Sequence, residues 1–168
     1  NKRIKILNIA KKIIKKTGLT NQIYQTISDK YNFDLNEIEV LFPDGKNDLL
    51  KFSLEVLNKD LEQSCKKINL IRLPVHKRIR IILLTKINLM RKEKEFYKKV
   101  FLNIILPKKN FSLSRQLYQS VDQMWFIAGD NSVDFNYYTK RLILAGIYSR
   151  IIFFFFNNND QEGLEKLL

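Results

Sequence analysis

Glycine and proline are scarce in this chain, with 5 glycines and 3 prolines among 168 residues. Folds built mainly from β-strands need many tight turns, and tight turns draw heavily on these two residues. Long stretches rich in Leu, Ile, Lys and Glu occupy most of the sequence. The composition therefore predicts an all-α protein with short connections, and the length suits one ordinary domain.

Cysteine and histidine, the usual carriers of metal and nucleophile chemistry, occur once each, as Cys65 and His76. A single cysteine excludes an internal disulfide, and Cys65 is interpreted as an incidental helix residue. His76 lies in the basic run 72–80 without a partner for a triad or a metal centre. The sequence also lacks the Glu-x-x-His spacing of di-iron bundles and a glycine-rich phosphate loop. We therefore expect no catalytic residue, no metal site and no cofactor, and predict that the protein is not an enzyme.

Acidic residues are outnumbered, with 17 Asp and Glu against 30 Lys and Arg. The excess falls in residues 1–110, which carry 25 basic and 11 acidic residues, whereas residues 111–168 carry 5 and 6. A basic surface of this kind can face nucleic acid or an anionic membrane. Alternatively, the lysines only solvate the helices of a chain rich in Ile, Lys and Asn.

Apolar runs are too short for a membrane span, which needs about 20 residues. The most apolar stretch, residues 142–156, is interrupted by Tyr148-Ser-Arg150 and is interpreted as a buried helix. No signal or transit peptide is evident near the first residue, Asn1.

Three short helices are expected at the N-terminal end, over 2–16, 21–30 and 34–41. Apolar residues recur near a period of 3.6 in each of them. Gly18 is placed to close the first helix, and Thr20 and Asp34 are placed to cap the next two. Three short helices with tight turns are typical of a helix-turn-helix unit.

Longer helices are predicted after the breaker Pro43-Asp-Gly45. Their expected ranges are 46–68, 75–90, 92–105, 111–128 and 134–156, with a stub over 161–168. The weakest boundary falls at Lys46, so we expect a helix-turn-helix unit over 1–45 and a larger helical bundle over 46–168.

The N-terminal unit resembles the DNA-binding end of the TetR family of bacterial regulators. The resemblance covers Leu7 to Leu50 and rests on Ala10, Gly18, the spacing of Ile23 and Ile27, Val40-Leu-Phe42 and Asp48-Leu49. It implies a TetR-like bundle and, as one possible function, a DNA-binding transcription regulator with an apolar ligand pocket. The recognition helix argues against that function because residues 34–41 hold three acids and no Lys or Arg. Phosphate contacts dominate DNA affinity, and Arg and Lys make the commonest base contacts.

The segment from Met124 to Arg141 reads as a helix end, a turn and a helix start, with Gly129 as the turn residue. Its residues closely resemble the signature of the Coq-nine family of ubiquinone biosynthesis. The matching residues are Met124, Trp125, Ala128, Gly129, Asp130, Asp134, Phe135, Asn136, Tyr137, Tyr138, Thr139 and Arg141. Upstream, Phe42-Pro-Asp-Gly45 is similar to the family's Phe-x-Asp-Gly segment.

This resemblance implies a non-catalytic homodimer that binds an isoprenoid or phospholipid tail in an internal pocket. It also implies that the protein presents the polyprenyl quinone intermediate to the demethoxyubiquinone hydroxylase. The implied docking patch for that hydroxylase consists of Asp122, Met124, Trp125 and Phe126. Family members end in an amphipathic membrane helix, of which only 161–168 remains here.

Residues 151–156 would be apolar on every side of a helix, so they must be buried all round or line a cavity. They therefore suggest candidates for the lipid pocket. The lipid-binding candidates are Leu83, Phe101, Leu102, Tyr138, Leu142, Ile152 and Phe155. Alternatively, these residues form plain core or a dimer interface. The basic segments 4–16 and 72–92 are expected to contact anionic lipid. The expected location is the bacterial cytoplasm, peripheral on the inner membrane, or the matrix side of the mitochondrial membrane in a eukaryote.

Overall fold

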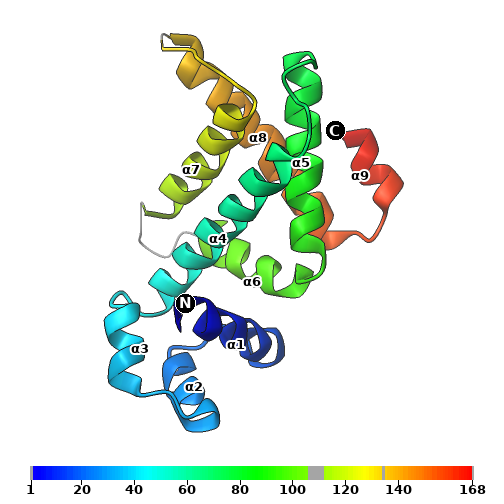
Figure 1. Ribbon diagram of the computed structural model, residues 1–168. Helices are drawn as coiled ribbons and strands as arrows, with labels where there is room; N and C mark the ends of the chain where they lie inside the picture. Colours follow the sequence, from blue (N-terminus) through cyan, green and yellow to red (C-terminus); the bar gives the residue numbers. More distant parts are fainter. Residues whose placement is uncertain (1, 106–111, 134, 168) are drawn as a thin grey trace.

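The computed structural model describes residues 2–105, 112–133 and 135–167 (Figure 1). Every regular element within these ranges is an α-helix. The predicted all-α fold class is therefore confirmed, and the order of short and long helices is that of a TetR-like bundle. Among the described helices, none is both long enough and apolar enough to cross a membrane.

The N-terminal unit consists of α1 (Lys2–Thr17), α2 (Ile23–Tyr31) and α3 (Leu35–Leu41). Gly18 ends α1 as predicted: its φ is 86°, and its amide donates to the Ile14 carbonyl at 3.0 Å. Asp34 caps α3 by accepting the Asn36 amide at 3.0 Å. The cap predicted at Thr20 is wrong, because a turn precedes α2 and Gln22 holds the N-cap position without a side-chain hydrogen bond.

The larger bundle follows directly. Its helices are α4 (Lys46–Lys66), α5 (Val75–Arg91), α6 (Lys94–Ile105), α7 (Ser112–Ile127), α8 (Phe135–Asn157) and α9 (Gln161–Leu167). Figure 1 shows α4 running from the N-terminal unit into the bundle, where it packs against α5 and α7. The core is one cluster of buried apolar side chains, to which α4 contributes Leu49, Leu54, Leu57 and Leu61.

The N-terminal unit is fastened to the bundle through α1 and α6, which pack against each other. The Lys11 amine pairs with the Glu93 carboxylate at 2.7 Å, just before α6 begins. The Lys99 amine donates to the Ile14 carbonyl at 2.6 Å near the end of α1. The same amine donates to the Lys15 carbonyl at 3.1 Å, so Lys99 caps the last turn of α1, where the final carbonyl groups lack intrahelical partners.

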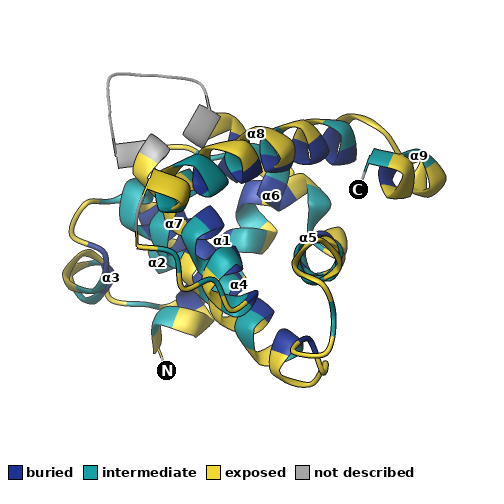
Figure 2. Ribbon diagram, turned by 90° about the horizontal axis from the view of Figure 1, so that it is seen from above, coloured by how far each residue is buried: buried dark blue, intermediate teal, exposed yellow. Residues whose placement is uncertain are grey.

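Helix α8 departs from the expectation of a helix buried on all sides. Tyr148, Ile151, Ile152, Phe155 and Phe156 are buried as expected. The opposite side exposes Tyr138, Leu142, Ile143, Ile147 and Phe153. Figure 2 shows buried and exposed positions alternating along this helix. The observed burial differs from the expected burial because apolar residues surround α8, whereas one chain provides packing neighbours on one side only.

Candidate functional site

The α7–α8 corner, which carries the signature residues, begins with a glycine-closed helix end. Gly129 has φ 80°, a left-handed conformation that glycine adopts without steric cost. The Asp130 amide donates to the Trp125 carbonyl, and the Gly129 amide donates to the Phe126 carbonyl, both at 3.0 Å. This pair of bonds is the Schellman motif, and it brings Asp130 back beside the end of α7.

Two acids and two bases then close the corner. The Asp130 carboxylate accepts from the Lys140 amine at 2.8 Å and from the Arg141 guanidinium at 3.1 Å. Arg141 also donates through Nε to Asp122 on α7 at 2.6 Å. The side chains of Asp130 and Arg141 are only 4% and 5% exposed, so this pair is shielded from water. Separating the two side chains would leave a buried charge without a partner, which is energetically costly. The pair therefore holds α7 and α8 in a fixed arrangement at the corner.

The pKa of Asp130 reports the balance of these contacts. Burial opposes the charged carboxylate, but hydrogen bonds from Lys140, Ser132 and Arg141 outweigh it and lower the pKa to about 2. Asp130 is therefore ionised throughout the neutral range, where its negative charge holds Lys140 and Arg141 at the corner.

Aromatic rings complete the corner. The Arg141 guanidinium lies 3.3 Å from the centre of the Tyr137 ring, and the Tyr137 hydroxyl donates to Asp122 at 3.0 Å. The Trp125 indole donates to the Lys140 carbonyl at 3.1 Å, and the Lys140 amine lies 5.5 Å from the Trp125 ring centre. Trp125 is thus held in place by α8.

The four residues expected to form the docking patch lie in different environments. Met124 is fully buried, so its inclusion as a surface contact is corrected: it faces the core from α7. Asp122 is occupied by Arg141 and Tyr137. Trp125 is half-buried, and Phe126 is 71% exposed. The surface available to a partner is therefore narrower and more apolar than the sequence suggested.

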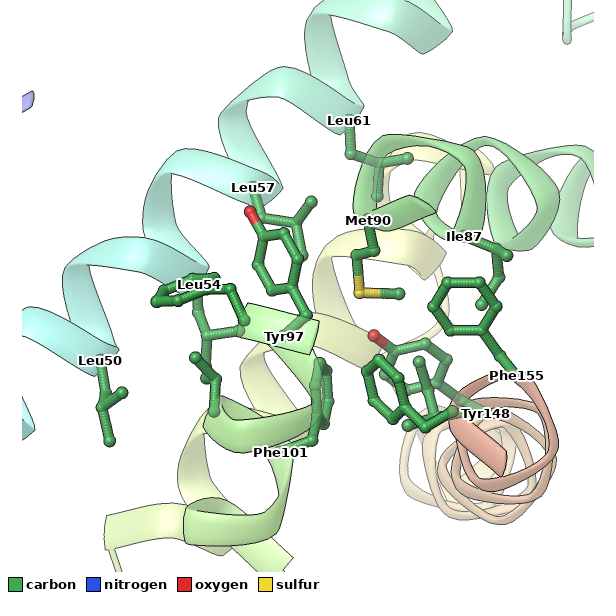
Figure 3. Packing of buried hydrophobic residues seen from close by; sticks show 14 of the residues in the cluster. Leu50, Leu54, Leu57, Leu61, Ile87, Met90, Tyr97, Phe101, Tyr148 and Phe155 are labelled. Atoms are coloured by element: carbon green, nitrogen blue, oxygen red, sulfur yellow. The ribbon is translucent and has the colours of Figure 1, made fainter. Parts of the chain in front are cut away.

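The seven lipid-binding candidates also separate into two groups. Leu83, Phe101, Ile152 and Phe155 are buried in the core, whereas Leu102, Tyr138 and Leu142 are exposed. The structure does not bring these groups together on one surface. Figure 3 shows Phe101, Tyr148 and Phe155 gathered beside Met90. Phe156 joins them, with its ring centre 5.5 Å from that of Phe101 and 5.1 Å from that of Phe155.

Sequence reasoning missed a polar cluster inside this core. Lys86 is completely buried, and its amine donates to the Asn58 side-chain oxygen at 2.7 Å. The same amine lies 5.3 Å from the centre of the Tyr148 ring, whose hydroxyl is buried without a hydrogen-bond partner. The available signal was Lys86 itself, the one charge in the stretch 81–87, whose other residues are Ile or Leu except for Thr85. Among the described residues, no group of three His, Cys, Asp or Glu side chains is arranged to hold a metal ion.

These features define a class: an all-α bundle of TetR-like build whose α7–α8 corner combines a conformationally fixed tryptophan with an exposed phenylalanine. Residues 112–165 match the sequence model of the COQ9 family. The matched residues span α7, the corner, α8 and most of α9, about a third of the chain. The family resemblance drawn from the signature is thereby confirmed.

Individual relatives match shorter stretches of the chain. The mitochondrial ubiquinone biosynthesis protein COQ9 of Rattus norvegicus is 53% identical over 49 residues, which is 29% of this chain and 16% of that protein. The Homo sapiens protein of the same name is 49% identical over 49 residues, 29% of this chain and 15% of that protein. COQ9-B of Xenopus laevis is 44% identical over 46 residues, 27% of this chain and 16% of that protein. The aligned stretch is therefore a small part of each relative.

Proposed function

We propose that this chain is a non-catalytic, lipid-binding accessory protein of ubiquinone biosynthesis that presents a polyprenyl quinone intermediate to the demethoxyubiquinone hydroxylase. The observation that carries the proposal is the COQ9 match over 112–165, which contains the whole ionic corner. The relatives are named as ubiquinone biosynthesis proteins. A corner fixed by Asp130 and Arg141 suits recognition, since a rigid surface loses little entropy on binding.

Docking of the hydroxylase is assigned to Trp125 and Phe126. Phe126 exposes a large apolar side chain and follows Trp125 in the sequence, whose indole donates to the Lys140 carbonyl. Aromatic residues of this kind dominate the binding energy of many interfaces. The acids of the corner are engaged by Arg141 and Lys140, so the patch presents a mainly apolar contact.

Lipid binding is assigned to the core around α6 and α8, which is rich in aromatic side chains. Its candidate wall consists of Leu83, Phe101, Ile152 and Phe155, all buried in one cluster. A polyprenyl tail gains about 0.8 kcal/mol for each CH2 that leaves water, so an apolar interior is a sufficient host. Entry of a tail requires these side chains to separate. This requirement predicts that the lipid-loaded protein differs from the described conformation in the packing of α6 and α8.

The exposed apolar face of α8 supports a homodimer. Tyr138, Leu142, Ile143, Ile147 and Phe153 are exposed along this helix. A second copy of the chain would cover them and would complete the burial that the sequence predicted for α8. Because the curated relatives are named as mitochondrial, we also propose a peripheral position on the matrix side of the mitochondrial membrane.

A TetR-type regulator is the alternative, and α3 gives it no support. Its exposed positions include Glu39 and Val40, and Glu37 pairs with Lys2 of α1. A basic side chain at these positions would be needed to contact phosphate or guanine.

Lipid extraction tests the carrier function. Lipids extracted from the purified full chain are identified by mass spectrometry. Stoichiometric quinone precursor or phospholipid is the expected result. A lipid-free protein that retards duplex DNA with a steep salt dependence would overturn the proposal in favour of a regulator.

Docking is tested separately, in the absence of lipid, by capture of the hydroxylase on immobilised chain. Phe126→Ser is expected to reduce capture by about tenfold or more, as for a central aromatic contact. Val40→Ser is the matched control, because Val40 is also exposed but lies on α3. Equal capture by the two variants would show that Phe126 lies outside the docking surface.

A further inference from the structure

The connection between α4 and α5 is an ordered structure at the end of the bundle away from α1–α3 (Figure 1). Within it, the Leu70 amide donates to the Ile68 carbonyl at 2.8 Å, and the Leu73 amide donates to the Leu70 carbonyl at 2.9 Å. The Arg78 guanidinium then donates to the Leu73 and Ile71 carbonyls at 2.7 and 2.8 Å. The connection is therefore held in one conformation by these hydrogen bonds and by Leu70, which is buried in the core.

Three other apolar side chains of this region point outward. Ile71 is 84% exposed, and Ile68 and Val75 are exposed as well. Phe126, at the end of α7, lies across a surface pocket from them. The pocket has a volume of about 530 Å³, and its lining includes Lys66, Lys67, Ile68, Ile71, Phe126 and Ile127. This volume lies in the range of pockets that hold small organic ligands, roughly 300–1,000 Å³.

Positive charge surrounds these apolar groups. Between residues 66 and 80 the chain has no Asp or Glu, and its basic residues are Lys66, Lys67, Arg72, Lys77, Arg78 and Arg80. On α4, Glu62 also lines the pocket and is paired with Lys66 at 2.7 Å. At the neighbouring corner, Asp130 is paired with Lys140 and Arg141. The acids that face the pocket and the corner are therefore already compensated, and Lys67 and Arg72 stay exposed.

We propose that this pocket and the α4–α5 connection bind the surface of an anionic phospholipid bilayer. The exposed Lys67 and Arg72 take the lipid phosphate, while Ile68 and Ile71 enter the apolar layer below it. A bilayer offers negative charge and an apolar interior within a few ångströms, and it matches both features at once. Nucleic acid would use the charge but would leave Ile71 in water. The assignment stands independently of lipid carriage in the core.

The other basic segment expected to meet lipid, α1, lacks this combination. Its apolar stripe of Ile6, Leu7, Ala10 and Ile14 is buried, so α1 presents mainly lysines. It also lies at the other end of the molecule in Figure 1. The structure therefore favours the α4–α5 connection over α1 as the part that enters the bilayer.

Flotation of the full chain with vesicles tests the assignment. The vesicles contain phosphatidylcholine alone or phosphatidylcholine mixed with phosphatidylserine, and no partner protein is present. Ile71→Ser is expected to lower partitioning into the mixed vesicles by about tenfold. Lys67→Gln is expected to lower it by about fivefold, the value for one lysine near an anionic surface. Val40→Ser and Lys12→Gln are the matched controls, because Val40 and Lys12 are exposed in the N-terminal unit.

Two results would overturn the assignment. One is equal partitioning of Ile71→Ser and Val40→Ser, which would show that the connection stays out of the bilayer. The other is loss of hydroxylase capture by Ile71→Ser without lipid present, with vesicle partitioning unchanged, which would make this surface a protein interface. Lipid extracted from Ile71→Ser should match the wild-type amount, so failure of this assignment is distinguishable from failure of the carrier function.

Discussion

The amine of Lys86 and the side-chain oxygen of Asn58 form a 2.7 Å hydrogen bond between α5 and α4 inside an apolar core. Among the described side chains, no carboxylate pairs with this amine within 4 Å. A buried ammonium group without a counter-charge is costly, and the cost falls on the folded state alone. Burial accordingly lowers the pKa of Lys86 to about 7.

The low pKa of Lys86 makes stability depend on pH. The unfolded lysine has a pKa of about 10.4, so between about pH 7 and pH 10 the unfolded state binds more protons than the folded state. The free energy of unfolding therefore rises with pH in this window, by about 2 kcal/mol from pH 7 to pH 9. Urea titrations at the two pH values measure it. Lys86→Met should remove the rise, whereas the exposed Lys77→Met should keep it; a rise that survives in Lys86→Met would exclude Lys86 as its source.

The ionic corner should be sensitive to the loss of its buried acid. Asp130→Asn leaves the Arg141 guanidinium short of a counter-charge, and we expect a loss of about 3 kcal/mol in the free energy of unfolding. Asp44→Asn is the control, because the ion pair of Asp44 with Lys51 is exposed and should contribute less than about 1 kcal/mol. Denaturant titration of both variants decides between these values. Similar small losses in both would mean that the corner is not held by charge.

Substitution by alanine at Gly129 and at Gly146 should change the stability in opposite directions. Gly129 has a positive φ, and an added Cβ would lie 3.3 Å from the Arg78 guanidinium, so Gly129→Ala should lower stability by about 1 kcal/mol or more. Gly146 lies within α8, and nothing would meet its Cβ within 4 Å in one chain. Gly146→Ala should therefore raise stability by about 0.5–1 kcal/mol. Thermal unfolding at low protein concentration measures both changes, and equal signs would contradict the backbone account of the corner.

The exposed face of α8 predicts the assembly state. If a second copy covers it, Leu142→Glu places a charge in an apolar interface and should convert dimers into monomers. Val40→Glu puts the same charge on α3 and should leave the mass unchanged. Light scattering coupled to size-exclusion chromatography measures the mass. A wild-type chain that stays monomeric at micromolar concentration would remove the dimer from the proposal.

Most helices of this protein could be predicted from local sequence signals. Gly18 and Asp34 act at the helix ends where their conformational preferences put them, because caps depend on a few neighbouring residues. The cap predicted at Thr20 was wrong although threonine is a good capping residue. The chain makes a turn after Thr20, so α2 begins later. Helix α8 marks the limit of periodicity, since apolar residues on every side do not reveal which side meets a neighbour.

The candidate site was predictable in location but not in geometry. The signature identified the corner, yet the partners of Arg141 lie 11 and 19 positions earlier in the chain and meet it only after α7 and α8 pack. Met124 could not be recognised as buried because its orientation depends on where α7 faces the core. The pairing of Lys86 with Asn58 spans 28 positions and was equally inaccessible.

Arg78 connects two surfaces that have been assigned different partners. Its guanidinium holds the carbonyls of Ile71 and Leu73 in the α4–α5 connection and that of Ala128 at the end of α7. Neither segment can shift alone without breaking these bonds. A molecule resting on a bilayer through Ile71 would therefore hold Trp125 and Phe126 at a set height and tilt above the lipid. The encounter with a membrane-bound partner would then become a search in two dimensions with the orientation already chosen.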